Sequence, residues 1–445
     1  MKIIKYGDGR VVKLIKKSDS CYDGDIRLSC FVFPYRTEKA VLLKNTLTKQ
    51  VILLTLEEWK MLCDGSLRND IKSELFRLCF IVNSESEDIN NYYTSLSVLR
   101  IMQAKRNGIE SYTILPTTGC NARCFYCYEE SWKTKTMTPD IADAVSDFIL
   151  RTRQEEMIRL YWFGGEPLCG SAAISRICSN LKDHGVEYYS TIITNATLFT
   201  PDLVKHAVAH WNLKRVQVSM DGAKIDYEQR KNYIQPQIHN YESAIHAIEL
   251  LSDAGVKVSV RCNYDKDNLS RIIIFFKDCK ERFKNRNNIS FYLEQLFQYE
   301  NEEESAALFK ASRNTSMLLD ELNLASTERL EQQLKIHYCM ADSQGKSVIV
   351  DPSGGLHLCE HDVQGKPFGT VFDSYPVWPA VEEFLSDECR SCCFLPNCTP
   401  FRKGSCPLKI AACKTQMEVR TERSLSIVLS DYLKNSKDIS EMDFS

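Results

Sequence analysis

The sequence predicts an α/β protein. Its central part has six alternating strand and helix segments, between a small α+β N-terminal unit and a cysteine-rich C-terminal unit. From Ser111 to about residue 300, apolar strand-like runs alternate with helix-like runs, which predicts parallel strands joined by helical crossovers. Such a sheet is either curved into an open barrel or wound flat. The expected strands are 112–115, 158–163, 191–194, 216–220, 256–260 and 289–293.

The first hundred residues predict a separate small sheet with helices. Two apolar runs around residues 46–49 predict a β-hairpin. Thr55 and Glu58 fit a capping box that opens a helix. The expected elements of this unit are strands 41–45, 51–54 and 80–82 and helices 55–62 and 71–78.

Signals for helix starts and strand ends support the predicted alternation of strands and helices in the central part. Thr138 and Thr200 are each followed by proline, as expected for an N-cap and the first helical position. Gly255 suits the end of a helix. In barrels of parallel strands the chemistry lies at the carboxyl ends of the strands. We therefore expect one mouth to collect the residues that closely follow strand ends, namely Cys120, Gly164, Asn195 and Asp221.

The overall composition excludes several classes of partner. The 445 residues carry a net charge of −3, which provides neither a broad basic surface for nucleic acid nor a polybasic membrane address. The chain has no apolar run long enough for a membrane span, and its start lacks an apolar signal core. We therefore expect a cytoplasmic protein. In a reducing cytosol its 19 cysteines indicate metal ligation rather than disulfides.

These patterns divide the chain into five parts. We expect an N-terminal unit at 1–100, a core at 101–300, a helical linker at 301–334, a cysteine-rich unit at 335–433 and a polar tail at 434–445.

The most specific motif is the CxxxCxxC run of Cys120, Cys124 and Cys127. A four-iron cluster takes one cysteine per iron, so three cysteines leave one iron open. A structural zinc loop normally has four ligands in two pairs, and no second pair lies near this run. With Tyr126 before its last cysteine, the run resembles the signature of radical SAM enzymes. In that family S-adenosylmethionine chelates the open iron, and the fold is a partial (β/α)6 TIM-like barrel.

Further residues match motifs of the radical SAM family. In that family a GGEP run binds the methionyl amine, and an S-x-D-G run ends a later strand. An arginine that follows the second run meets the methionyl carboxylate in related enzymes. Polar residues also end the third and fifth strands of family members. The resemblance implies a cofactor-binding set of Tyr126, Gly164, Gly165, Glu166, Asn195, Ser219, Asp221 and Arg230, with Arg261 and Asn263 as weaker candidates.

A second cysteine pattern lies near the C-terminus. It resembles the seven-cysteine SPASM domain, which carries two auxiliary iron–sulfur clusters. Cys406 departs from the usual spacing, Cys393 competes with its neighbour Cys392, and a zinc ribbon is the rival interpretation. The resemblance implies one cluster on Cys389, Cys392, Cys398 and Cys413 and another on Cys339, Cys359 and Cys406.

The resemblance also implies a reaction. With three [4Fe–4S] clusters and S-adenosylmethionine, a radical SAM/SPASM enzyme forms a 5′-deoxyadenosyl radical that takes hydrogen from a ribosomally made peptide. We expect a thioether as the product. In the related sulfatase-maturating enzymes, an aspartate that follows the cysteine matching Cys359 is a general base. Glu360 is the candidate for that role, and a solvated glutamate is the alternative.

The implied partners are a precursor peptide with a leader and an external electron donor such as flavodoxin or ferredoxin. We expect the leader to add as a strand to the 41–54 hairpin. The alternatives are a sulfatase maturase that forms formylglycine and, in a different class, a cysteine-rich zinc scaffold without catalysis.

Overall fold

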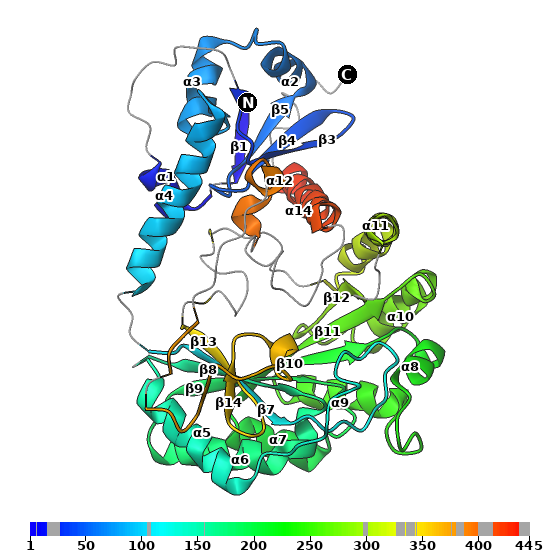
Figure 1. Cartoon of the computed structure of the whole chain (residues 1–445). Coiled ribbons are helices and arrows are strands. Elements are labelled where there is room, and N and C mark those ends of the chain that lie inside the picture. Colours follow the sequence, from blue (N-terminus) through cyan, green and yellow to red (C-terminus); the bar gives the residue numbers. More distant parts are fainter. Residues whose placement is uncertain are drawn as a thin grey trace.

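The computed structural model describes residues 1–5, 7–15, 27–104, 108–154, 156–296, 301–325, 334, 343, 345–374, 376–379, 387–398 and 413–435. Figure 1 shows a large α/β body and a smaller N-terminal body, with helices α12 and α14 of the C-terminal part beside the smaller one. Within these residues, no helix combines the length and the apolar character needed to cross a bilayer.

The N-terminal body is a four-stranded antiparallel sheet with helices. The strand order is β1-β5-β4-β3, and β2 pairs with β6 in a second small sheet. The capping box of Thr55 and Glu58 is present at the start of α2, which confirms that prediction. The elements are β1 (Lys2–Lys5), α1 (Gly9–Leu14), β2 (Arg27–Leu28), β3 (Val32–Arg36), β4 (Ala40–Asn45), β5 (Val51–Thr55), α2 (Leu56–Cys63), α3 (Asn69–Arg77), β6 (Ile81–Val82) and α4 (Glu85–Ala104).

The predicted hairpin is formed by β4 and β5, but its expected role as a docking edge is wrong. Strand β4 pairs with β5 and β3, and β5 pairs with β4 and β1. Both hairpin strands therefore have a partner on each side, and neither can accept a further strand. The edges of this sheet are β1 and β3.

All six predicted parallel strands are present in the central body, which confirms that prediction. Strands β7 to β12 pair in sequence order, each parallel to the next. The elements are β7 (Ser111–Thr117), α5 (Pro139–Thr152), β8 (Ile158–Gly164), η1 (Pro167–Gly170), α6 (Ser171–Asp183), β9 (Tyr188–Thr194), α7 (Pro201–His210), β10 (Leu213–Met220), α8 (Lys224–Lys231), α9 (Tyr241–Asp253), β11 (Lys257–Tyr264), α10 (Leu269–Arg282) and β12 (Ile289–Gln295). Thr138 and Thr200 cap α5 and α7 with their side chains, as predicted.

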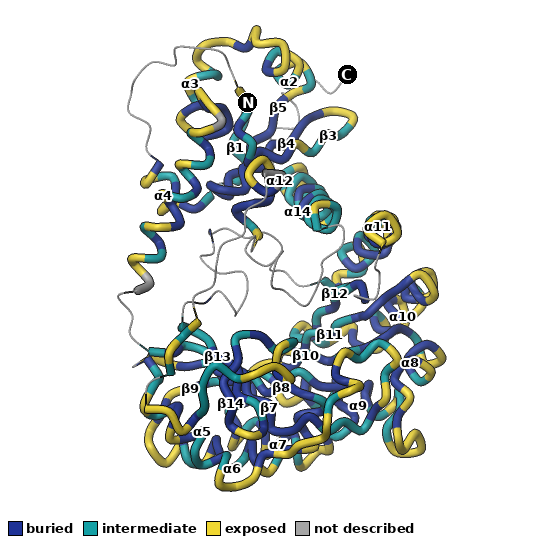
Figure 2. The backbone as a smooth tube through the Cα atoms, in the orientation of Figure 1, coloured by how far each residue is buried: buried dark blue, intermediate teal, exposed yellow. Residues whose placement is uncertain are grey.

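The two faces of the central sheet differ in burial. Along β8 and β9, buried and half-buried residues alternate strictly. The buried face, with residues such as Trp162 and Ile192, packs in the main core with α5, α6, α7 and α9, which cover one side of the sheet in Figure 1. Each large apolar side chain in this core contributes about 1.5–3 kcal/mol. The opposite side, here called the inner face, is half-buried along β8 and β9. Figure 2 shows the backbone coloured by burial.

The C-terminal part extends the central sheet in a way the sequence did not indicate. The hairpin of β13 and β14 is as expected, but β13 also pairs in parallel with β7. The full sheet order is β12-β11-β10-β9-β8-β7-β13-β14-β15, so the sheet is open rather than closed on itself. The remaining elements are α11 (Glu302–Glu321), β13 (Ser347–Val350), β14 (Gly355–His357), η3 (Glu360–Asp362), β15 (Gly369–Thr370), α12 (Asp387–Arg390), η4 (Leu395–Asn397) and α14 (Cys413–Asn435).

Helix α14 connects the two bodies. Its residues Leu425 and Leu429 pack against the N-terminal sheet around Phe33 and Leu42. On its other side, Arg423 donates to Asp320 of α11 at 2.7 Å. The C-terminal helix therefore contacts both the small sheet and the helix that follows the central sheet.

Candidate active site at the carboxyl ends of the central strands

The three cysteines of the CxxxCxxC run lie in the loop that follows β7. Cys120, Cys124 and Cys127 are all free thiols of intermediate burial. They stand at the carboxyl end of a parallel strand, the end at which such folds place their chemistry. This edge of the sheet, where β7 to β12 end, is called the mouth below.

The cysteine loop is pinned by the segment that ends α8. The backbone N–H of Arg123 donates to the carbonyls of Lys231 and Asn232, both at 3.0 Å, and Ile234 donates to the carbonyl of Asn121 at 3.0 Å. Asn232 ends the helix in the left-handed region, with φ of 47°. A loop without regular structure is thus held by main-chain hydrogen bonds to a segment that follows β10.

Burial raises the pKa of all three thiols in this loop. It raises the pKa of Cys120 to about 12, with a further contribution from Glu166, and it raises the pKa of Cys127 to about 11. Burial also raises the pKa of Cys124. A bound metal deprotonates a thiol outright, so these residues suit ligation better than free nucleophilic chemistry.

The number of these thiols matches a four-iron cluster that keeps one iron open. Among the described residues, no three His, Cys, Asp or Glu side chains converge closely enough to hold one metal ion. A four-iron cluster is larger than one ion and takes each thiolate on a different iron. Three thiols on one short loop at the mouth fit that ligand set.

The glycine pair after β8 brings that strand against the cysteine loop. Gly164 has φ of +106°, which favours glycine. A Cβ at Gly165 would lie 2.5 Å from the carbonyl oxygen of Gly119 and 2.6 Å from that of Thr118. The close approach that Gly165 permits is therefore to the chain itself, directly before Cys120.

Glu166 is fully buried, and protein donors occupy most of its carboxylate. Its Oε1 accepts from Thr194 Oγ1 at 2.7 Å and from the N–H of Leu168 at 3.2 Å, and its Oε2 accepts from the N–H of Asn195 at 2.8 Å. Burial raises its pKa. A carboxylate has about four acceptor positions, so one position remains on Oε2. The predicted contact to a methionyl ammonium requires that position.

Asn195 ties the end of β9 to the cysteine loop. Its Nδ2 donates to Asn121 Oδ1 at 2.8 Å, and its Oδ1 accepts from the backbone and hydroxyl of Thr197 at 3.1 and 2.8 Å. The side chain therefore positions the loop, and the predicted contact with the cofactor remains a prediction.

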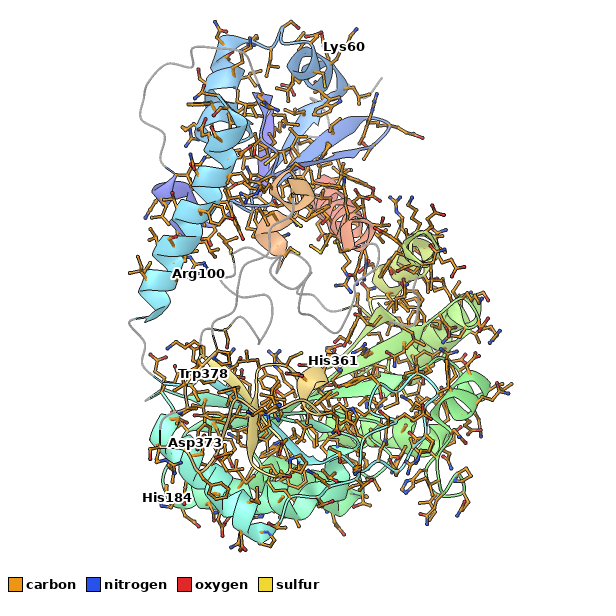
Figure 3. All side chains as sticks on the ribbon, in the orientation of Figure 1. Lys60, Arg100, His184, His361, Asp373 and Trp378 are labelled. Carbon is orange, nitrogen blue, oxygen red and sulfur yellow. The ribbon has the colours of Figure 1, made fainter. Side chains whose placement is uncertain are left out.

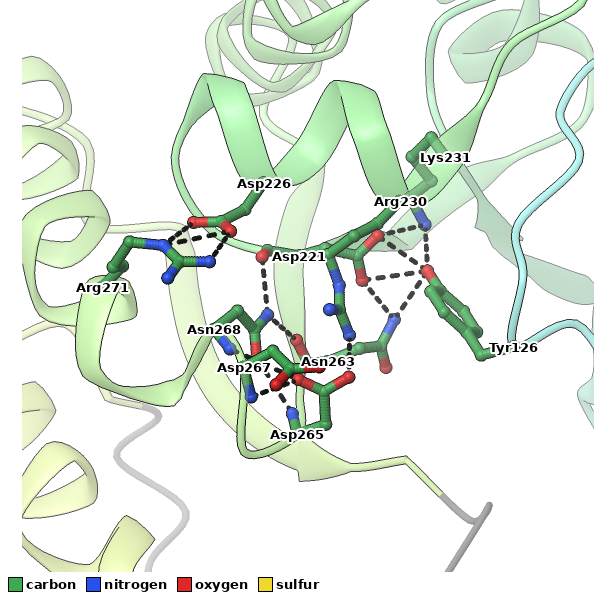
Figure 4. A network of polar contacts seen from close by, with 10 residues as sticks. All are labelled: Tyr126, Asp221, Asp226, Arg230, Lys231, Asn263, Asp265, Asp267, Asn268 and Arg271. Carbon is green, nitrogen blue, oxygen red and sulfur yellow. Dashed lines mark hydrogen bonds and ion pairs between the residues drawn. The ribbon is translucent and has the colours of Figure 1, made fainter.

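A buried polar network lies under the cysteine loop (Figure 4). The hydroxyl of Tyr126 donates to Asp221 at 2.7 Å. Lys231 Nζ donates to the Tyr126 hydroxyl at 2.9 Å and to Ser219 Oγ at 3.0 Å, and it stands 3.4 Å from Asp221 Oδ2. Asn263 donates to Asp221 Oδ1 at 3.1 Å. Four of the predicted or candidate site residues, Tyr126, Ser219, Asp221 and Asn263, thus meet around one lysine.

The charges in this network balance each other. Asp221 is 0% exposed and Lys231 is 2% exposed. Burial lowers the pKa of Lys231, but the nearby Asp221 and Cys124 raise it further, so the pKa is raised. Burial and Asp221 together raise the pKa of Tyr126 well above its ordinary value. The lysine is therefore a fixed cation and the tyrosine a neutral donor.

Arg230 lies beside this network but pairs with a different acid. Its Nη2 donates to Asp265 Oδ2 at 2.7 Å, and its guanidinium lies 4.9 Å from the ring centre of Phe125. Its Nε is buried and has no partner among the described residues. The guanidinium retains a free donor, which the predicted contact with a carboxylate needs.

Glu360, the predicted base, reaches the mouth from the C-terminal part. It follows Cys359, whose thiol lies 3.9 Å from its Oε2. The next residue, His361, stacks on Tyr128 with ring centres 4.2 Å apart, and Figure 3 shows it beside the central sheet. Burial lowers the pKa of His361. The structure therefore places the Cys359 loop against the loop that follows Cys127.

The remaining described cysteines of the C-terminal part do not lie on the loop that carries Cys359. Cys389, Cys392 and Cys398 belong to the α12–η4 segment, where the N–H of Cys392 donates to the carbonyl of Cys389 at 3.2 Å. This segment packs through Phe394 on the N-terminal sheet, and Cys413 begins α14. Cys339 and Cys406 lie outside the described residues. The two-cluster assignment remains a prediction.

Sequence reasoning missed three residues of this site. Lys231 is the centre of the network, and Asp265 is the partner of Arg230. Glu129 is buried with no partner for its Oε2 among the described residues, and burial raises its pKa to about 7. Lys231 had no distinguishing signal, because adjacent basic residues in the last turn of a helix usually face solvent.

Substitution of Gly165 tests the close contact between β8 and the cysteine loop. In Gly165→Ala the new Cβ would overlap the backbone of Gly119, so we expect a loss of about 1–3 kcal/mol in the free energy of unfolding, measured with urea. Gly9→Ala is the matched control, because nothing lies within 4 Å of a Cβ built there. Equal stabilities of the two variants would contradict the contact.

Substitution of Lys231 tests the buried charge balance. Lys231→Met leaves Asp221 buried without its cation, so we expect a loss of about 3–5 kcal/mol in the free energy of unfolding. Adding Asp221→Asn should recover part of that loss, and a double-mutant cycle in urea measures the coupling. Strictly additive effects would show that the two charges do not stabilise each other.

Known proteins resemble this chain in its central body. Residues 114–279 match the family model of the Radical SAM superfamily. The probable GTP 3′,8-cyclase of Methanococcus maripaludis, strain C7, is 29% identical over 148 residues, which are 33% of this chain and 47% of that protein. The chain thus matches about half the length of this curated relative.

Two solved structures share the fold. Native anSMEcpe with bound AdoMet has a TM-score of 0.58 at 16% identity, covering 73% of this chain and 100% of that one. The same protein with AdoMet and the Cp18Cys peptide has a TM-score of 0.57 at 15% identity, with 73% and 100% covered. Together with the three-cysteine loop at the mouth, the family match shows that residues 114–279 form a radical SAM domain.

Proposed function

We propose that this enzyme matures a ribosomally made peptide by closing a thioether between a cysteine sulfur and a carbon of another residue. The observation that carries the proposal is the site at the mouth. There the three-cysteine loop, the glycine turn after β8 and the Tyr126–Asp221–Lys231 network meet in a radical SAM domain.

The residues at the mouth fit the cofactors that the family implies. Cys120, Cys124 and Cys127 would each bind one iron of a four-iron cluster and leave the fourth for S-adenosylmethionine. The remaining acceptor position of Glu166 would receive the methionyl ammonium, and the unpaired Nε of Arg230 would donate to the carboxylate. When bound, the reduced cluster and S-adenosylmethionine supply the 5′-deoxyadenosyl radical that takes hydrogen from the peptide.

In this reaction the protein's own residues would hold the cysteine loop in place and exclude water from the layer beneath it. Lys231 and Asp221 fix Tyr126, and through it the loop between Cys124 and Cys127. Main-chain hydrogen bonds from Arg123 hold the same loop against α8. Burial of this network excludes water from the layer beneath the cysteines, so the loop rests on a preorganised base.

A peptide substrate is supported from two sides. The fold likeness includes anSMEcpe, which binds the Cp18Cys peptide. The inner face of the sheet is half-buried along β8 and β9, so no apolar core covers it completely. An external electron donor such as flavodoxin or ferredoxin and two auxiliary clusters belong to the same proposal. Those clusters would accept the electron that is left when the bond closes.

A second candidate is the oxidation of a cysteine or serine to formylglycine. The position of Glu360 favours it, because this carboxylate lies between Cys359 and His361, whose ring contacts Tyr128 in the loop after Cys127. The two products differ in mass. A thioether keeps the cysteine sulfur and loses one thiol hydrogen and one carbon-bound hydrogen, whereas formylglycine made from cysteine loses the sulfur. Mass spectrometry of the treated peptide decides between them, and loss of sulfur would overturn the thioether proposal.

The initiating cysteines provide the first test. Changing Cys120, Cys124 and Cys127 together to alanine should abolish 5′-deoxyadenosine release, because no thiolates remain to hold the iron. The expected iron content falls by about one four-iron cluster, while iron on the C-terminal cysteines remains. A triple change of Cys178, Cys262 and Cys279 to alanine is the control, since these cysteines are buried in the core. Undiminished release in the first variant would refute the site, and zinc in place of iron in the anaerobic wild type would favour a scaffold.

A leader peptide is proposed to add to strand β3, which is an edge of the N-terminal sheet. A hollow of about 390 Å³ lies between this strand and α14, lined by Tyr35, Leu429, Ser430 and Leu433 among others. Figure 1 shows β3 at the outer side of the small sheet, near α14. Backbone pairing along β3 and apolar side chains in the hollow would together hold an extended peptide.

Filling this hollow tests leader recognition. In Ser430→Trp the indole should occupy the hollow, and we expect affinity for a labelled leader peptide to fall at least about tenfold. Lys60→Trp is the matched control, because Lys60 is exposed on α2 of the same unit. Fluorescence anisotropy measures both variants, and thermal unfolding checks that they are folded. Equal affinities would place the recognition of the leader elsewhere.

A further inference from the structure

A second hollow lies on the inner face, away from the mouth. It has a volume of about 770 Å³, within the range of ligand pockets. Its walls are the amino-terminal halves of β8 to β12, the end of α10 and the residues after α11. A liquid water occupies about 30 Å³, so this space holds far more than one small ion.

The described residues that line this hollow carry a net positive charge. Arg215, Lys257, Lys280 and Lys284 all line it, and no ion pair within the described residues involves any of them. Arg286 also lines it but is neutralised by Asp253, at 3.0 Å. No Asp or Glu is among the lining residues in the part of the chain that the structure describes. Four cations around one concavity without acidic partners raise the local concentration of anions.

The hollow and the active site lie on the same face of strand β10. In a strand, alternate residues share a face, so Arg215, Gln217 and Ser219 of β10 lie on the same face. Ser219 is at the mouth, where it accepts from Lys231 at 3.0 Å. Gln217 lines the hollow and accepts from Tyr292 of β12 at 2.9 Å. Four residues of strand separate Arg215 from Ser219, or about 13 Å, which an extended peptide of about four residues spans.

We propose that this basic hollow binds an acidic segment of the peptide substrate while a neighbouring residue of that peptide lies at the mouth. The inference rests on the proposed function and specifies its substrate as a peptide with several carboxylates. Two features favour a chain over a small anion: the hollow is large, and its cations are distributed over β10, β11 and α10. A single phosphate would contact only part of that set.

The binding should be electrostatic in character. The cations of the hollow are partly exposed, so added salt screens them, and affinity should fall as ionic strength rises. Replacing aspartates by asparagines removes the charge and retains the shape, so an asparagine peptide should bind at least about tenfold more weakly.

The test uses the full-length, anaerobically purified enzyme and a fluorescein-labelled peptide of alternating Gly and Asp, with its Gly–Asn counterpart. Anisotropy is measured for the wild type and for Lys257→Gln/Lys280→Gln/Lys284→Gln. The control, Lys182→Gln/Lys205→Gln/Lys277→Gln, removes the same charge from exposed lysines outside the hollow. We expect at least about a tenfold loss of affinity in the first variant and less than about twofold in the control.

Three outcomes would overturn the inference: equal losses in both variants, equal binding of the two peptides, or displacement of the acidic peptide by ADP at a lower concentration than by unlabelled peptide. The last outcome would assign the hollow to a nucleotide. The proposed function is judged separately, by 5′-deoxyadenosine release and peptide mass. An enzyme that cleaves S-adenosylmethionine but ignores the acidic peptide refutes only the hollow. The Gly–Asp peptide has no cysteine, so its binding tests the hollow alone, and the mass test of the proposed function uses a cysteine-containing peptide.

Discussion

The active site depends on one buried ion pair, between Asp221 at the end of β10 and Lys231 at the end of α8. The cysteine loop has no helix or strand of its own, so its shape must come from what it touches. Tyr126 of that loop donates to the aspartate and accepts from the lysine, which anchors the loop at the point between two cysteines. Two opposite charges of low exposure, each with further hydrogen-bond partners, satisfy the conditions under which a buried pair is tolerated. The same two charges fix the conformation of the cysteine loop, which the backbone preferences of its residues alone would not determine.

The inner face of the sheet carries different features at the two ends of its strands. At the carboxyl ends lie the cysteine loop, the glycine turn and the buried network. At the amino ends lie unpaired cations around a hollow. The opposite face is apolar and packs against helices, so mutations there act on stability rather than chemistry. One alternating pattern thus provides a core on one side and, on the other, the face on which we propose that the substrate lies.

The sequence predicted the six central strands, the proline-marked helix starts, the capping box and the three-cysteine loop, because each has a local signal. It could not predict partners set by distant contacts. The pairing of β13 with β7 joins residues more than two hundred positions apart, and nothing local marks it. Glu166 was assigned to a ligand, yet its carboxylate mostly caps η1 and holds the end of β9. The hairpin at 41–54 was identified, but only the sheet order shows that its strands have no free edge.

The C-terminal part is divided between the two bodies, and this division has a mechanical consequence. Its first half joins the central sheet through β13 and brings Cys359 and Glu360 to the mouth. Its second half packs on the N-terminal sheet through Phe394 and Leu425. A peptide held at β3 would therefore be linked to the mouth by a rigid chain of contacts through α14, α11 and β12, including the ion pairs Arg423–Asp320 and Arg420–Glu294. If the leader binds at β3 as proposed, the part of the chain that carries the C-terminal cysteines connects that binding site to the central sheet by packing.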